Sequence, residues 1–128
     1  MTASILQGFV PGRFPLDAYG AGGFRFAGMS HKGSILALPS GISAWSAASA
    51  ADIGAASLAA LFDEPRGAVE LLLLGTGDEL AVLPQRLRWR LSEAGVKCEV
   101  MQTGPAARTY NILLAENRRV AAALLAVP

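Results

Sequence analysis

The sequence predicts a protein of the α/β class, and two features of its second half support this prediction. Between residues 68 and 115, apolar segments of strand length alternate with helical patterns in the order strand, helix, strand, helix. The first segment, AVELLLLGTG (68–77), carries four consecutive leucines and ends in glycines, as in a strand covered on both faces. The crossover between two such strands is right-handed in nearly all proteins. The length of 128 residues fits a single domain over residues 1–128.

Residues 1–50 are predicted to form short strands separated by glycine and proline turns. The segment ILQGFV (5–10) is the first of these apolar pieces. Further on, HKGS (31–34) stands between the apolar segments FRFAGM and ILAL. This arrangement predicts a hairpin turn in which Gly33 is free to adopt a positive φ.

An alanine- and serine-rich segment follows, and it predicts a helix from Asp52 to about Phe62. Asp52 is a residue type that caps helix N-termini. Ile53, Leu58 and Leu61 are apolar side chains that favour burial, so the low complexity here indicates small side chains rather than disorder.

The next helix is predicted from its boundaries and its apolar stripe. Pro84 suits the first turn of a helix, and Gly95 suits the position just past its end. Leu87 and Leu91 are four residues apart and define the buried face. The segment VKCEVM (96–101) is then predicted to be a strand.

The end of the chain leaves two alternatives open. Pro105 is predicted to begin a helix, with Thr103 or Gly104 near its cap. The propensities of alanine and leucine would continue this helix to Ala126. Alternatively, the sequence NRR breaks the helix and leaves VAAALLAV (120–127) as a buried strand.

Two threonine–glycine turns follow the two predicted strands of the second half, and they define a candidate ligand site. Ligands of open α/β sheets bind at the carboxyl ends of strands, so we expect the two turns to face each other. The start of a helix adds free N–H groups and a positive dipole. A carboxylate or phosphate of a small molecule is therefore predicted to bind at Gly75, Thr76, Gly77, Thr103, Arg108, Thr109, Tyr110 and Asn111.

A structural interpretation of the same residues is the alternative. Tyr110 would then belong to the core, and Asn111 would bond to a neighbouring loop. Arg108 would pair with Glu99 or Glu116.

No catalytic residues, metal site or cofactor are predicted. The dinucleotide fingerprint is incomplete, because Leu80 stands where its third glycine is required. His31 is the only histidine and is expected to be exposed, and Cys98 is the only cysteine and is expected to be buried. A single cysteine excludes an internal disulfide and fits a reducing compartment. No signal peptide or membrane-spanning segment is predicted, so we expect a cytoplasmic protein.

The distribution of charge and one tryptophan indicate a candidate surface for a protein partner. Residues 1–83 have a net charge of −3 and residues 84–119 one of +4, while the whole chain has +1 and predicts no attraction to nucleic acid. Trp89 lies about 200° around the helix from Leu87 and is expected to point outward. The candidate partner-binding residues are Arg86, Trp89 and Arg90, unless a loop or the N-terminal strands cover the tryptophan.

Several segments together resemble a known family. YGAGGFRFAG, GSILALP, ELLLLGTG and LPQRLRWRLSEAGVKCEVMQTGPAARTYNILLAENRRVAAAL are similar to the Mth-type domain of unknown function, over about Tyr19 to Leu125. The resemblance implies a three-layer domain with a central mixed β-sheet flanked by helices, additional N-terminal β structure and a separate final strand. Many relatives have a cysteine where Ala107 stands, so thiol chemistry at that position is not expected here.

The resemblance also bears on function. It implies no established catalytic activity, and the mitochondrial members look like assembly factors of respiratory complex I. Bacterial relatives resemble accessory proteins whose genes often neighbour those of protein-export components. We therefore expect a non-enzymatic binding or assembly module with an unidentified protein partner. A homodimer, and a ligand-binding or enzymatic role at the two turns, are the alternatives.

Overall fold

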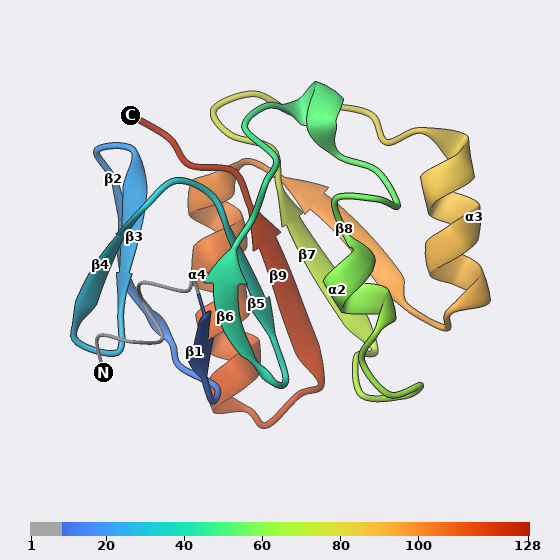
Figure 1. Cartoon of the computed structure of the whole chain (residues 1–128), viewed down its shortest axis with the longest axis horizontal. Coiled ribbons are helices and arrows are strands. Elements are labelled where there is room, and N and C mark those ends of the chain that lie inside the picture. Colours follow the sequence, from blue (N-terminus) through green and yellow to red (C-terminus); the bar gives the residue numbers. More distant parts are fainter. Residues whose placement is uncertain (1–8) are drawn as a thin grey trace.

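The computed structural model describes residues 9–128, so the first four residues of the predicted ILQGFV strand lie outside the described residues. A six-stranded mixed sheet forms the centre of the molecule, with helices on both of its faces (Figure 1). A separate three-stranded antiparallel sheet comes from the N-terminal part of the chain. The three-layer α/β class with additional N-terminal β structure is thus confirmed.

The large sheet has the strand order β1-β6-β5-β9-β7-β8. β7 is parallel to both of its neighbours, β8 and β9, whereas the pairs β5–β9, β5–β6 and β1–β6 are antiparallel. The strands are β1 (Phe9–Pro11), β5 (Ile35–Leu38), β6 (Gly41–Ala44), β7 (Leu71–Gly75), β8 (Lys97–Met101) and β9 (Val120–Leu124).

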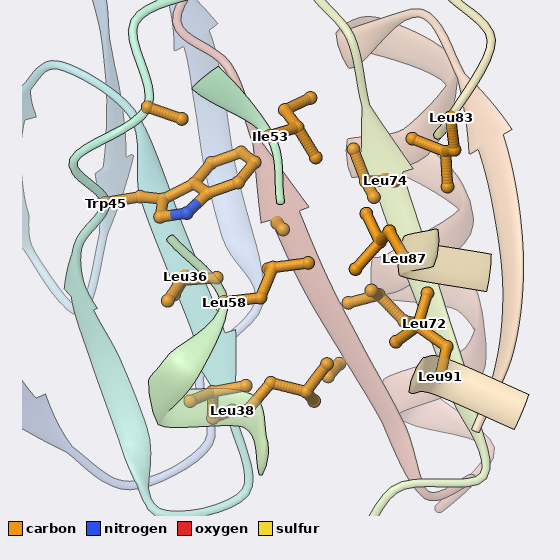
Figure 2. Packing of buried hydrophobic residues seen from close by; sticks show 14 of the residues in the cluster. Leu36, Leu38, Trp45, Ile53, Leu58, Leu72, Leu74, Leu83, Leu87 and Leu91 are labelled. Carbon is orange, nitrogen blue, oxygen red and sulfur yellow. The ribbon is translucent and has the colours of Figure 1, made fainter. Parts of the chain in front are cut away.

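The two faces of the large sheet bury two separate clusters of side chains. Leu72 and Leu74 of β7 pack against Leu87 and Leu91 of α3 (Gln85–Glu93), as Figure 2 shows. Leu73 points the opposite way, into a cluster beneath α4 (Thr103–Ala115) and the small sheet. This alternation follows from the two-residue period of a strand. The prediction that this strand is covered on both faces is confirmed.

β9 decides between the two alternatives for the end of the chain. Asn117 adopts a φ of 62°, and this left-handed conformation follows the end of α4. All five residues of β9 are buried between β5 and β7. A central place in the sheet pairs the backbone on both sides, which outweighs the helical propensity of alanine and leucine. The separate final strand that the family resemblance implied is confirmed.

The helix predicted from Asp52 to Phe62 is wrong. The structure has instead a 3-10 turn, η1 (Ala50–Asp52), and a single helical turn, α2 (Ala59–Phe62). The indole Nε1 of Trp45 donates a hydrogen bond of 2.7 Å to the carbonyl oxygen of Ser57. Because Trp45 is itself buried in the core, this contact holds the linking segment against the sheet in a non-helical path.

The small sheet consists of β2 (Leu16–Gly20), β3 (Gly23–Phe26) and β4 (Met29–Lys32). The hairpin turn predicted at HKGS is wrong, because His31 and Lys32 lie within β4. The turn is formed by Ala27 and Gly28, whose φ angles of 51° and 74° suit a two-residue hairpin loop. Gly33 does adopt the predicted positive φ, at 96°, where the chain leaves β4.

Candidate functional site

The two threonine–glycine turns lie side by side at the carboxyl ends of β7 and β8, as expected from the strand order. The backbone N–H of Thr103 donates to the carbonyl oxygen of Gly77 at 2.9 Å. In return, the N–H of Gly77 donates to Thr103 Oγ1 at 3.0 Å. The N–H of Thr76 donates to the carbonyl oxygen of Met101 at 2.9 Å, so the two turns form a hydrogen-bonded joint.

This joint is tightly packed. Thr103 is fully buried, and its hydroxyl donates to the carbonyl oxygen of Leu125 at 2.7 Å while it accepts from Gly77. A Cβ atom at Gly75 would lie 2.9 Å from the Cα of Thr103, which is closer than real Cβ atoms approach. There is no room here for even a methyl group, so Gly75 and Thr103 serve to join the two turns.

The N-terminus of α4 is covered by β2. Gln102 is the N-cap, so the helix begins at Thr103, two residues before the predicted start at Pro105. A Cβ at Gly104 would lie 2.5 Å from the hydroxyl oxygen of Tyr19. Tyr19 of β2 therefore packs directly against the first turn of the helix, which only a glycine permits.

Arg108 lies on the exposed side of α4 and contacts the small sheet. Its Nη1 donates to the hydroxyl of Tyr19 at 3.0 Å. The pairing with Glu99 or Glu116 that the structural alternative predicted is wrong; in the described chain, the ion pairs are those of Glu70 with Arg118 and Arg119.

The next three residues of α4 point in different directions. Thr109 Oγ1 donates to the carbonyl oxygen of Pro105, one turn earlier, at 2.8 Å. Tyr110 is only 1% exposed, and burial raises the pKa of its hydroxyl. The amide of Asn111 donates from Nδ2 to the carbonyl oxygen of Leu16 at 2.7 Å and accepts from its N–H at 2.8 Å. Asn111 thus pairs with the backbone of β2 as a neighbouring strand would.

A hollow of about 380 Å³ lies between β2 and α4. Arg108 and Asn111 line it from the helix, and Asp17 and Tyr19 line it from the strand. The structure therefore brings these two predicted site residues together with β2 rather than with the turn after β7. Sequence reasoning missed Asp17 and Tyr19, because they lie about 90 residues from the helix and form no motif with it; the YGAGG segment of the family resemblance was the available signal.

The outward orientation predicted for Trp89 is confirmed. Its side chain is 68% exposed on α3, whereas Leu87 on the opposite side of the helix is 2% exposed. Arg86 is exposed one turn before the tryptophan. The guanidinium carbon of Arg90 lies 3.9 Å from the ring centroid of Phe62, a cation–π contact that holds α3 against α2. Of the three candidate residues, Arg90 is thus engaged within the chain, whereas Arg86 and Trp89 are exposed.

The two residues with inherent chemical reactivity are both half-buried. Burial raises the pKa of the Cys98 thiol to about 11, so the sulfur is protonated at neutral pH and is a poor nucleophile. His31 is half-buried beside Phe26, which corrects the expectation that it is exposed. Over residues 9–128, the His, Cys, Asp and Glu side chains form no group that could hold a metal ion. None of the helices in this range combines the length and the apolar character that a membrane span requires.

These features describe a small α/β domain in which the strand ends are closed by a hydrogen-bonded joint and an arginine- and tryptophan-bearing helix is exposed. The chain belongs to the family described as "Protein of unknown function (DUF498/DUF598)", whose model matches residues 16–125.

Similar proteins include bacterial and mitochondrial members. An uncharacterised protein of Rhodobacter capsulatus is 44% identical over 117 residues, which cover 91% of this chain and 88% of that protein. The protein called NADH dehydrogenase [ubiquinone] 1 alpha subcomplex assembly factor 3 is 34% identical in Xenopus tropicalis, over 86% of this chain and 60% of that protein. The human protein of the same name is 31% identical, over 98% and 67% respectively.

Solved structures show the same fold. The crystal structure of a Bartonella henselae protein, described as an outer membrane protein, has a TM-score of 0.87 and 48% identity, covering 92% of this chain and 98% of that one. The solution structure of an Mth938-like domain from Bordetella pertussis has a TM-score of 0.76 and 35% identity, covering 88% and 85%. The resemblance to the Mth-type domain is confirmed.

Proposed function

We propose that this protein is a non-enzymatic binding module that assists the assembly of a membrane complex of the NADH dehydrogenase type. The names of the mitochondrial relatives support the kind of complex. The observation that carries the proposal is Trp89, a large aromatic side chain that is 68% exposed beside Arg86. Tryptophan and arginine are the residues most enriched among those that dominate the energy of protein interfaces.

The chemistry of α3 indicates the kind of partner surface. The exposed side of the helix carries Arg86 and Arg88 around the indole, with Glu93 as the acidic residue of the helix. A complementary partner would offer a pocket for the tryptophan ring and acidic groups around it. Trp89 lies opposite the buried stripe of α3, so it can enter such a pocket without rearrangement of the core.

A photo-crosslinking experiment tests this surface. A benzophenone amino acid in place of Trp89 is expected to crosslink to subunits of the NADH dehydrogenase complex in cells that express this protein. The matched control carries the same group in place of Ile112, which is 59% exposed on α4, on the other face of the sheet. Crosslinks identified by mass spectrometry at position 89 but not at position 112 are the expected result.

A genetic rescue gives the second readout. In a strain without this protein, wild type is expected to restore membrane NADH:quinone oxidoreductase activity, and Trp89→Ala combined with Arg86→Glu is expected to fail. Exposed substitutions of this kind change stability by about 0.5 kcal/mol or less, so the variant remains folded. Full rescue by the variant contradicts the proposed surface, and crosslinks to export components alone would assign the protein to an export complex instead.

An anionic small molecule in the hollow between β2 and α4 is the second candidate function. The observation that favours it is the exposed Arg108, which lines this hollow together with Asn111. The residues of the adjoining joint would then support the site rather than bind the ligand themselves; they are Gly75, Thr76, Gly77 and Thr103.

Thermal unfolding with a panel of phosphates and carboxylates tests this candidate. Arg108→Ala is expected to leave the melting temperature of the free protein nearly unchanged and to abolish protection by the anion that binds. At an anion concentration of about 100 times its Kd, binding is expected to raise the free energy of unfolding of the wild type by about 2.7 kcal/mol. Arg25→Ala is the matched control, because Arg25 donates a similar hydrogen bond of 3.0 Å to Ser30 Oγ elsewhere on the small sheet. If Arg108→Ala is protected as well as the wild type, or if no anion protects the wild type, the candidate is rejected.

A further inference from the structure

β8 is the last strand of the large sheet, and one of its edges is open. β7 pairs with β8 on one side, and no other strand of residues 9–128 pairs with it on the other. β8 is five residues long, whereas β1 at the opposite edge has three. Unpaired edge strands are templates for pairing with another chain.

The hydrogen bonds to β7 show which backbone groups of β8 face the open edge. The N–H of Lys97 donates to the carbonyl oxygen of Glu70, and the carbonyl oxygen of Met101 accepts from Thr76. In a parallel pair, alternate residues direct their backbone groups to the same neighbour. Cys98 and Val100, which lie between them, therefore direct both N–H and C=O away from β7, toward the open edge.

The helix beside β8 leaves this edge accessible. A groove of about 530 Å³ runs between α3 and β8. Arg88 and Ser92 line it from the helix, and Val96, Cys98 and Val100 line it from the strand side. The last three side chains are only half-buried, so a strand laid along the edge would complete their burial.

We propose that a second copy of this chain docks on the open edge, with the two β8 strands antiparallel across a two-fold axis at Cys98. Each copy uses the same surface, as in most homodimers. The two large sheets then form one continuous sheet, and the outward N–H and C=O groups of Cys98 pair with those of the second copy. Arg88 borders both this surface and that of Trp89, but Trp89 itself points away from the sheet, so the inference does not depend on the proposed function.

Charge complementarity selects both the occupant and the register. Lys97 and Glu99 are both exposed on β8 and point to the same face of the sheet. With the axis at Cys98, Lys97 of each copy lies directly opposite Glu99 of the other, which gives two favourable pairs. An axis at Lys97 would place two lysines opposite each other, and an axis at Glu99 would do the same with two glutamates.

One charge opposes association. Arg88 lines the groove in each copy, so pairing brings two guanidinium groups toward the axis. We therefore expect a reversible dimer rather than a permanent one.

Charge reversal measured by sedimentation velocity tests the proposal, over about 1 μM to 1 mM protein. Lys97→Glu and Glu99→Lys are each expected to weaken the dimer roughly tenfold or more, because each turns two attractive cross-strand pairs into repulsive ones. In the double variant, with both reversals, the dissociation constant of the dimer is expected to return to within about threefold of the wild-type value. Lys32→Glu is the control, because Lys32 is exposed on a strand of the small sheet.

Amide hydrogen exchange gives a second readout that locates the interface. The amides of Cys98 and Val100 are expected to become protected as the protein concentration rises. Those of Lys97 and Glu99, which already face β7, should not change. A wild type that is monomeric throughout, single reversals without effect, a double variant that fails to recover, or unchanged exchange at Cys98 would each overturn the proposal.

Discussion

Replacement of Tyr110 by alanine is expected to lower the free energy of unfolding by about 4 kcal/mol. The tyrosine ring is 1% exposed and belongs to the cluster beneath α4, which also contains Leu73 of β7 and Phe24 of the small sheet. Removal of the ring leaves a cavity among elements that the sheet holds in place, so the surrounding side chains cannot collapse fully. Chemical denaturation monitored by far-UV circular dichroism measures the change.

Tyr110→Phe is the matched variant, because it keeps the ring and removes only the hydroxyl. The structure shows no hydrogen bond from this hydroxyl to any residue of 9–128, so a change within about 1 kcal/mol is expected. A loss as large as that of Tyr110→Ala would mean that the hydroxyl, rather than the ring, is the important group.

The parts of the fold that the sequence predicts well are those with a strong local pattern. Four consecutive leucines that end in a glycine turn are typical of a strand buried on both faces, and β7 is such a strand. Leu87 and Leu91 fix the buried side of α3, and Gly95 follows its end with a φ of 77°. No distant contact is needed for these conclusions.

The incorrect predictions concern segments whose conformation depends on distant contacts. The linker after Asp52 has helical composition but is held by Trp45, which packs on the large sheet. Ala27 occupies a positive-φ turn position, at 51°, where an asparagine or glycine would have revealed the hairpin. For β9, propensity favoured a helix, and only the family resemblance gave the strand.

The site shows the same limit. The contact between the two turns could be predicted, because the carboxyl ends of neighbouring parallel strands lie at the same end of the sheet. That Asn111 would bond to Leu16, 95 residues away, had no signal in either segment. The hydrogen bond from the Thr103 hydroxyl to the carbonyl oxygen of Leu125 could not be predicted either. Leu125 directly follows β9, and local propensity did not decide whether that segment is a helix or a strand.

Replacement of Thr103 by valine is expected to lower the free energy of unfolding by about 3 kcal/mol, although the two side chains have nearly the same shape. The hydroxyl joins the N–H of Gly77 to the carbonyl oxygen of Leu125, and Thr103 is fully buried. Valine would leave both groups without a partner in a place that water does not reach. Denaturant unfolding measures the loss, and Thr103→Ser, which keeps the hydroxyl, is expected to lose only about 1 kcal/mol.

Thr109→Val is the control that separates the joint from the residue type. Thr109 also donates to a carbonyl oxygen, that of Pro105, but this oxygen lies within α4 and the threonine is only half-buried. Its loss is therefore expected to change stability by about 0.5 kcal/mol or less. A loss of only about 0.5 kcal/mol for Thr103→Val, as for the control, would mean that the hydroxyl of Thr103 does not hold the turns together. The joint would then be held by the backbone hydrogen bonds from Thr103 to Gly77 and from Thr76 to Met101.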